Sequence, residues 1–75
     1  MVAFELPAPA RVVIDVFDTQ GRWVKRLADE SFTAGRHAST WRGDDEGGHP
    51  LGSGVYFIRM RAGAFQAARR TVRVR

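Results

Sequence analysis

The chain has 75 residues, 44% of them hydrophobic, and no cysteine, so it can form one small domain without a disulfide framework or a cysteine-based zinc site. It contains no apolar run of the roughly 20 residues that a membrane helix requires, and its N-terminus lacks the basic-then-apolar pattern of a signal peptide. The net charge is +4, and Lys25 is the only lysine among twelve basic residues. Because the arginines are spread along the chain, strand alternation sends many of them to solvent, which disfavours a nucleic-acid-binding protein.

Two strands are expected in the first 18 residues. Residues 2–6 (VAFEL) form a short one, which Pro7 and Pro9 end because proline cannot donate a ladder hydrogen bond. Residues 11–18 (RVVIDVFD) form the second, with one fully apolar face and one face that carries a single charge, Asp15. We expect the first face to be buried and the second to be half-exposed. The first face holds Val12, Ile14 and Val16, and the second face holds Val13, Asp15 and Phe17.

A hairpin is expected after the second strand. In Asp18-Thr19-Gln20-Gly21, an aspartate that can bond to the backbone ahead is followed by a glycine that tolerates positive φ. Residues 23–28 (WVKRLA) follow, but Val24 and Leu27 are three apart and break the alternation. Either a bulge re-aims one of them or the segment is a helical turn, and the hairpin signal favours the bulged strand.

The middle of the chain is expected to alternate loops and strands. Residues 29–36 predict a loop anchored by Phe32, and residues 37–43 predict a strand that buries Trp41 and places His37 half-buried at a sheet edge. Residues 44–54 hold four glycines and a proline and predict a loop with Leu51 beneath it.

The C-terminal third predicts a hairpin. In residues 55–62, Tyr56, Ile58 and Met60 lie on one face, and Ala62-Gly63-Ala64 turns the chain back into residues 65–75. Six short strands with polar turns predict an all-β fold, a small antiparallel immunoglobulin- or fibronectin III-like β-sandwich of six to seven strands, as a single domain over residues 1–75.

Two groups of polar residues in the 42–49 region suggest sites. Asp44, Asp45 and Glu46, with His49 nearby, could hold calcium through their carboxylate oxygens, but the alternating acidic spacing of known calcium loops is missing, so we interpret them as turn residues. Arg42-Gly43-Asp44 spells a tripeptide that adhesion receptors read, and we interpret it too as a turn. We therefore expect no metal and no cofactor.

Catalysis is not expected either. His37 and His49 are the only imidazoles, and no serine has an evident base and orienting acid beside it. We therefore expect no catalytic residue, no small-molecule substrate and no enzyme activity. The basic end of the chain is the candidate recognition surface, and solvated edge residues that discourage aggregation are its alternative. Its residues are Arg69, Arg70, Arg73 and Arg75.

The order of these features resembles the FlgD-type immunoglobulin-like domain and the related C-terminal sorting domain of type IX secreted proteins. The resemblance covers nearly the whole chain. It rests on Asp18, Gly21-Arg22, Val24, Leu27, Ala34-Gly35, His37, Trp41, Gly43 and Ser53-Gly54-Val55-Tyr56-Phe57.

The resemblance implies a non-catalytic C-terminal module of a larger exported bacterial protein, located at the cell surface or outside the cell. Its role would be secretion sorting or surface anchoring, with the secretion machinery or parent-protein domains as partners. The alternative is a structural subunit, either a flagellar hook-cap-like scaffold or an oligomer or fibre that self-associates through an edge strand. The family often begins with a further segment, so we expect the sandwich to lack the family's first strand.

Overall fold

The structure, a computed structural model, describes residues 2–73, which form strands, turns and loops. Among these residues, no helix is long and apolar enough to cross a membrane. The strands confirm the predicted all-β sandwich and number six over this range. They are β1 (Val2–Leu6), β2 (Ala10–Phe17), β3 (Trp23–Phe32), β4 (Gly35–Ser39), β5 (Gly54–Ala62) and β6 (Phe65–Arg73).

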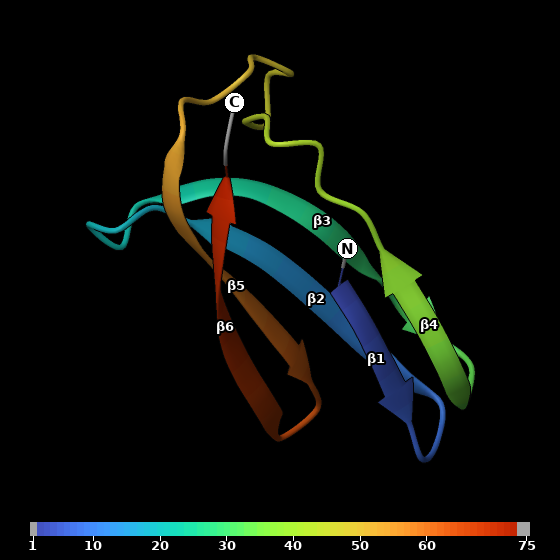
Figure 1. Ribbon diagram of the computed structural model, residues 1–75. Helices are drawn as coiled ribbons and strands as arrows, with labels where there is room; N and C mark the ends of the chain where they lie inside the picture. Colours follow the sequence, from blue (N-terminus) through green and yellow to red (C-terminus); the bar gives the residue numbers. More distant parts are fainter. Residues whose placement is uncertain (1, 74–75) are drawn as a thin grey trace.

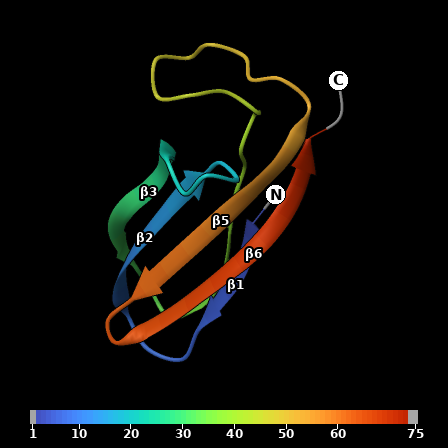
Figure 2. The ribbon, with the colours of Figure 1, turned by 90° about the vertical axis from the view of Figure 1, so that its left-hand side faces the viewer.

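The strands form two antiparallel sheets (Figure 1). The larger sheet has the order β3-β2-β5-β6, and the smaller one pairs β1 with β4. Seen from the side, β1 lies behind β5 and β6 (Figure 2). The chain crosses between the sheets three times, and the last crossing uses the glycine-rich loop of residues 40–53. The expected hairpins, β2–β3 and β5–β6, are both present.

The core lies between the sheets and is centred on β2. Val12, Ile14 and Val16 are completely buried, as their alternation predicted, and Leu6 and Ile58 complete the set of buried hydrophobic residues. Burial of such a side chain contributes roughly 1.5–3 kcal/mol, so these few residues supply much of the stability of so small a domain. Tyr56 and Met60 pack against this core and are half-buried.

Strand β3 confirms the bulged strand but is longer than expected. Its pairing with β2 shifts between Ile14 and Asp15 and again between Val16 and Phe17, which explains the broken alternation. The prediction of a loop at residues 29–36 is wrong for its first half, because the pairing of β3 with β2 continues as far as Phe32, which lies opposite Ala10. Arg11 of β2 holds this extension by an ion pair to Asp29, with 2.8 Å between Nη2 and Oδ1. Phe32 packs against the core as expected.

The strand expected at residues 37–43 is displaced towards the N-terminus. Strand β4 is Gly35–Ser39, so Trp41 lies beyond the sheet and is half-buried rather than fully inside. Its indole Nε1 donates to the carbonyl oxygen of Asp44 at 2.8 Å, and its ring meets Tyr56 edge-on at 5.1 Å. The polar end of the indole therefore bonds to the loop while its apolar body covers the core. His37 is half-buried, as expected, and its ring packs against those of Phe4 and Phe32.

The β2–β3 turn depends on one glycine. Oδ1 of Asp18 accepts hydrogen bonds from the backbone N–H groups of Gln20 and Arg22, both at 2.9 Å, and Gly21 has a φ of 80°.

Alanine at Gly21 should lower the free energy of unfolding by about 1 kcal/mol, because a residue with a Cβ disfavours this left-handed backbone conformation, although no other atom lies within 4 Å of the position that the Cβ would take. Urea unfolding measures the change. Gly52→Ala, equally open but without positive φ, is the control and should leave stability nearly unchanged; equal losses in both variants would contradict the interpretation.

Candidate recognition surface

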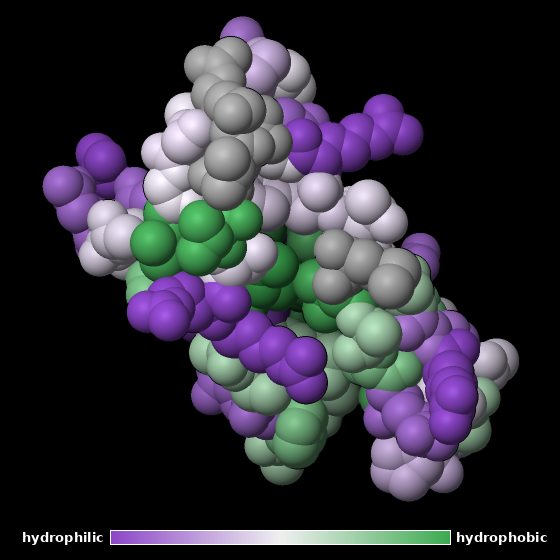
Figure 3. Space-filling view, viewed as in Figure 1, coloured by the Kyte–Doolittle hydropathy of each residue, from purple (hydrophilic) through white to green (hydrophobic). Residues whose placement is uncertain are grey.

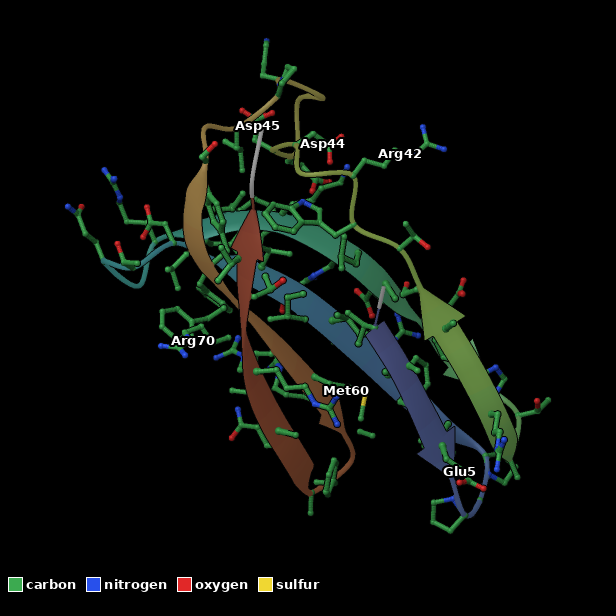
Figure 4. The ribbon with its side chains drawn as sticks, viewed as in Figure 1. Glu5, Arg42, Asp44, Asp45, Met60 and Arg70 are labelled. Carbon is green, nitrogen blue, oxygen red and sulfur yellow. The ribbon has the colours of Figure 1, made fainter. Side chains whose placement is uncertain are left out.

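The arginines of β6 do not form one surface. In the pairing with β5, Arg69 lies opposite Ile58 on the inner face of the sheet, whereas Arg70 lies opposite Phe57 on the outer face. Figure 4 shows the Arg70 side chain directed away from β1. The backbone of Arg73 pairs with Gly54, but its side chain and the whole of Arg75 lie outside the described part of the chain. The predicted cluster therefore divides between two faces, and its role in recognition stays a prediction.

Arg69 lies at the rim of a hollow between the two sheets. The smaller sheet covers only part of the larger one, so the inner face of β5 and β6 is open towards the free edge of β1. The hollow measures about 650 Å³, and green apolar side chains are visible within it in the space-filling view (Figure 3). The side chain of Met60 points into it (Figure 4). Its lining includes Val2, Phe4, Trp41, Ile58, Met60, Phe65, Ala67, Arg69 and Thr71.

A buried carboxylate on the outer face of the larger sheet was missed by sequence reasoning. Only 1% of the Asp15 side chain is exposed. Its Oδ1 accepts hydrogen bonds from Arg26 Nε at 2.9 Å and from Trp23 Nε1 at 3.0 Å, and its Oδ2 lies 3.8 Å from Nη2 of both Arg59 and Arg61. The expectation that this face is half-exposed holds for Val13 and Phe17 but is wrong for Asp15, which the long side chains of β3 and β5 cover.

The groups around Asp15 favour its ionised form. Burial alone would raise the pKa of this carboxyl, but hydrogen bonds from Arg26 and Trp23, together with the charges of Arg26 and Arg59, lower the pKa below its ordinary value. The Arg59 guanidinium also stacks over the Phe17 ring, 4.7 Å from its centroid. The Asp15 carboxylate is therefore paired within the cluster, and its evident contribution is to join β2, β3 and β5.

The acidic group in the long loop is also internally paired. Asp44 accepts a 2.8 Å hydrogen bond from Lys25 Nζ, Asp45 accepts from the backbone N–H of His49 at 2.9 Å, and Glu46 accepts from the backbone N–H of Arg26 at 3.0 Å. These contacts fasten the loop to β3 and close its tip, in agreement with the interpretation as turn residues. Among the described residues, no group of three or more acidic, histidine or cysteine side chains is arranged to hold a metal ion.

In the tripeptide Arg42-Gly43-Asp44, the aspartate carboxylate is not accessible to a receptor. The Asp44 carboxylate is mostly covered and is bound to Lys25, and Gly43 is buried, whereas Arg42 extends outward (Figure 4). Since an adhesion sequence must offer both charges to its receptor, this geometry favours the structural interpretation of the tripeptide.

The two imidazoles have local structural partners. A ring nitrogen of His37, Nε2, lies 2.8 Å from the carbonyl oxygen of Thr33, and Nδ1 of His49 lies 3.2 Å from Oδ1 of Asp45. Each contact joins residues four apart in the sequence, so each stabilises the local turn between them.

Comparison with known proteins identifies a family. A family model of the FlgD Ig-like domain matches residues 1–64. Neither the curated proteins nor the solved structures gave a significant match. The matched range contains β1 to β5 and the whole glycine-rich loop.

Proposed function

Because the chain belongs to the family of FlgD Ig-like domains, we propose that it is a non-catalytic structural module of an exported bacterial assembly, of the flagellar hook-cap type. The observation that carries this proposal is the family match over residues 1–64, on a chain that folds as two antiparallel sheets. A location outside the cytoplasmic membrane or at the cell surface is part of the proposal.

The described geometry agrees with a scaffolding role. The carboxylates of Asp15, Asp44 and Asp45 are bound to neighbouring residues and hold strands and loops together. What the domain offers to other molecules is its sheet edges and faces. Such surfaces suit assembly through backbone pairing and apolar contact.

Hook assembly in the organism that encodes the protein tests the proposal. Deleting residues 1–75 should reduce the number of completed hooks counted by electron microscopy, while a strain carrying only Gly52→Ala should assemble them normally. Normal hook numbers in the deletion strain would contradict the hook-cap role.

Secretion sorting is the second candidate, and the exposed arginines of edge strand β6 favour it. Arg69 and Arg70 are exposed on opposite faces of that strand, where sorting machinery could contact them. A reporter fused to residues 1–75 should leave the periplasm of a host with type IX secretion, and glutamate at both arginines should reduce its release. Retention of the unmodified fusion would rule this role out.

A further inference from the structure

The open side of the sandwich has the features of a strand-accepting groove. In the described chain, β1 pairs only with β4 and β6 pairs only with β5, so each has a free edge of backbone N–H and C=O groups. Strands β1 and β6 flank the hollow and run in opposite directions (Figures 1 and 2). Between them lies the partly uncovered inner face of the larger sheet. An added strand would form hydrogen bonds with the free backbone groups of one edge and would also cover the inner face of the larger sheet.

The edge of β1 is the better of the two for this purpose. A strand added to β1 widens the smaller sheet across the hollow, so its inward side chains lie over Met60, Phe65 and Ala67. A strand added to β6 would instead widen the larger sheet and leave the hollow open. Phe65 is 58% exposed, so covering it removes apolar surface from water.

Charge determines what kind of strand fits. Arg69 lies on the inner face, C-terminal to Ala67 along β6 and so towards the N-terminal end of β1 (Figure 1), and it makes no ion pair with any described residue. At the other end Glu5 is exposed on the outer side of β1, where a like charge directly opposite would be unfavourable. A second copy of this chain that inserted β6 would bring another arginine-rich strand against Arg69. The groove therefore favours a strand that is acidic where it faces Arg69 and not acidic where it lies beside Glu5.

We propose that this groove binds an extended segment of a partner protein, paired antiparallel to the free edge of β1. The segment carries apolar side chains at every second position, facing Met60 and Ala67, and an inward acidic side chain at its C-terminal end, facing Arg69. Antiparallel pairing follows the pattern of the strand pairs that the structure describes. This inference rests on the groove itself and not on the hook-cap role.

A short synthetic strand tests the proposal on the intact chain. The probe is a capped peptide, Lys-Leu-Thr-Val-Thr-Val-Thr-Asp, whose apolar residues alternate and whose aspartate follows in the same phase. Titration followed by NMR should shift the backbone amide signals of β1, and hydrogen exchange at that edge should slow. A peptide of the same composition without alternation should produce neither change. Equal effects from both peptides, or no effect from the first, would overturn the proposal.

A charge exchange separates the groove from general attraction to a basic protein. Arg69→Glu should weaken binding of the probe about fivefold, and a probe ending in lysine should restore it. Arg42→Glu changes the net charge by the same amount at an exposed position outside the lining of the hollow and is the matched control, with an expected change of less than about twofold. Equal losses in the two variants would show nonspecific attraction. Light scattering that finds a dimer, together with a probe that binds only when the dimer dissociates on dilution, would show that a second copy fills the groove; either result would overturn the proposal.

Discussion

Alanine at position 15 should lower the free energy of unfolding by about 3 kcal/mol, a large effect for a polar residue outside the main core. The change removes the carboxylate that joins Arg26, Arg59 and Arg61 and leaves the Trp23 indole without its acceptor. Breaking a buried ion pair costs about 3–5 kcal/mol, and the partial exposure of the three arginines places this site at the lower end of that range. Urea unfolding followed by tryptophan fluorescence measures the loss.

Asp29→Ala is the matched control for this prediction. Asp29 also bridges two arginines, Arg11 and Arg26, but about a third of its side chain is exposed to water. Its removal should cost less than about 1 kcal/mol, as expected for a solvated ion pair. Similar losses in the two variants would mean that burial does not distinguish the sites.

The effect of Asp15→Ala should also depend on pH. The folded state lowers the pKa of Asp15 below its ordinary value of 3.8, so folding favours the ionised form. This part of the stability is present above pH 3.8 and is lost as the pH falls through the folded-state pKa. The difference between the native chain and the variant should therefore be constant above about pH 5 and shrink towards pH 2. A difference that stays constant down to pH 2 would show that the carboxylate charge is not what stabilises the site.

Local patterns predicted those parts of the fold that depend on neighbouring residues. Alternation in β2 identified Val12, Ile14 and Val16 as core, and the aspartate and glycine of residues 18–21 identified the hairpin turn. Both signals act within a few residues, so they can be read without knowing which strands pair. The bulge in β3 was also visible, as a break in the same alternation.

The features that were missed depend on register between distant strands. Asp15 looked like a solvated charge because Arg26, Arg59 and Arg61 lie 11 or more residues away and come together only when β2 pairs with β3 and β5. Trp41 looked like a strand residue because alternation does not reveal that its indole bonds to the loop backbone. The hollow beside β1 depends on which sheet each strand joins, which local patterns do not specify. The separation of Arg69 from Arg70, by contrast, follows from strand alternation alone and could have been anticipated.

Alanine at position 14 should lower the free energy of unfolding by about 3–4 kcal/mol. Ile14 is completely buried at the centre of β2, between Ala28 of β3 and Met60 of β5. Its truncation loses the transfer free energy of the removed atoms and leaves a cavity that fixed strands on both sides cannot close. A domain of this length has a total stability of roughly 4–11 kcal/mol, so the variant should be close to unfolding at 37 °C.

Two further variants show whether burial at this position is the cause. Ile14→Val removes one methyl group and should cost about 1 kcal/mol, since the cavity is smaller. Val72→Ala, at a position 62% exposed on edge strand β6, should change the free energy of unfolding by less than about 0.5 kcal/mol. Denaturant unfolding of the three variants should thus give losses in the order Ile14→Ala, Ile14→Val, Val72→Ala. A loss below about 1 kcal/mol for Ile14→Ala would mean that the two sheets do not close over β2 as the structure describes. Met60 contributes both to this core and to the lining of the strand-accepting groove. Such a result would therefore also mean that the surface against which a partner strand is proposed to pack is not firmly held in place.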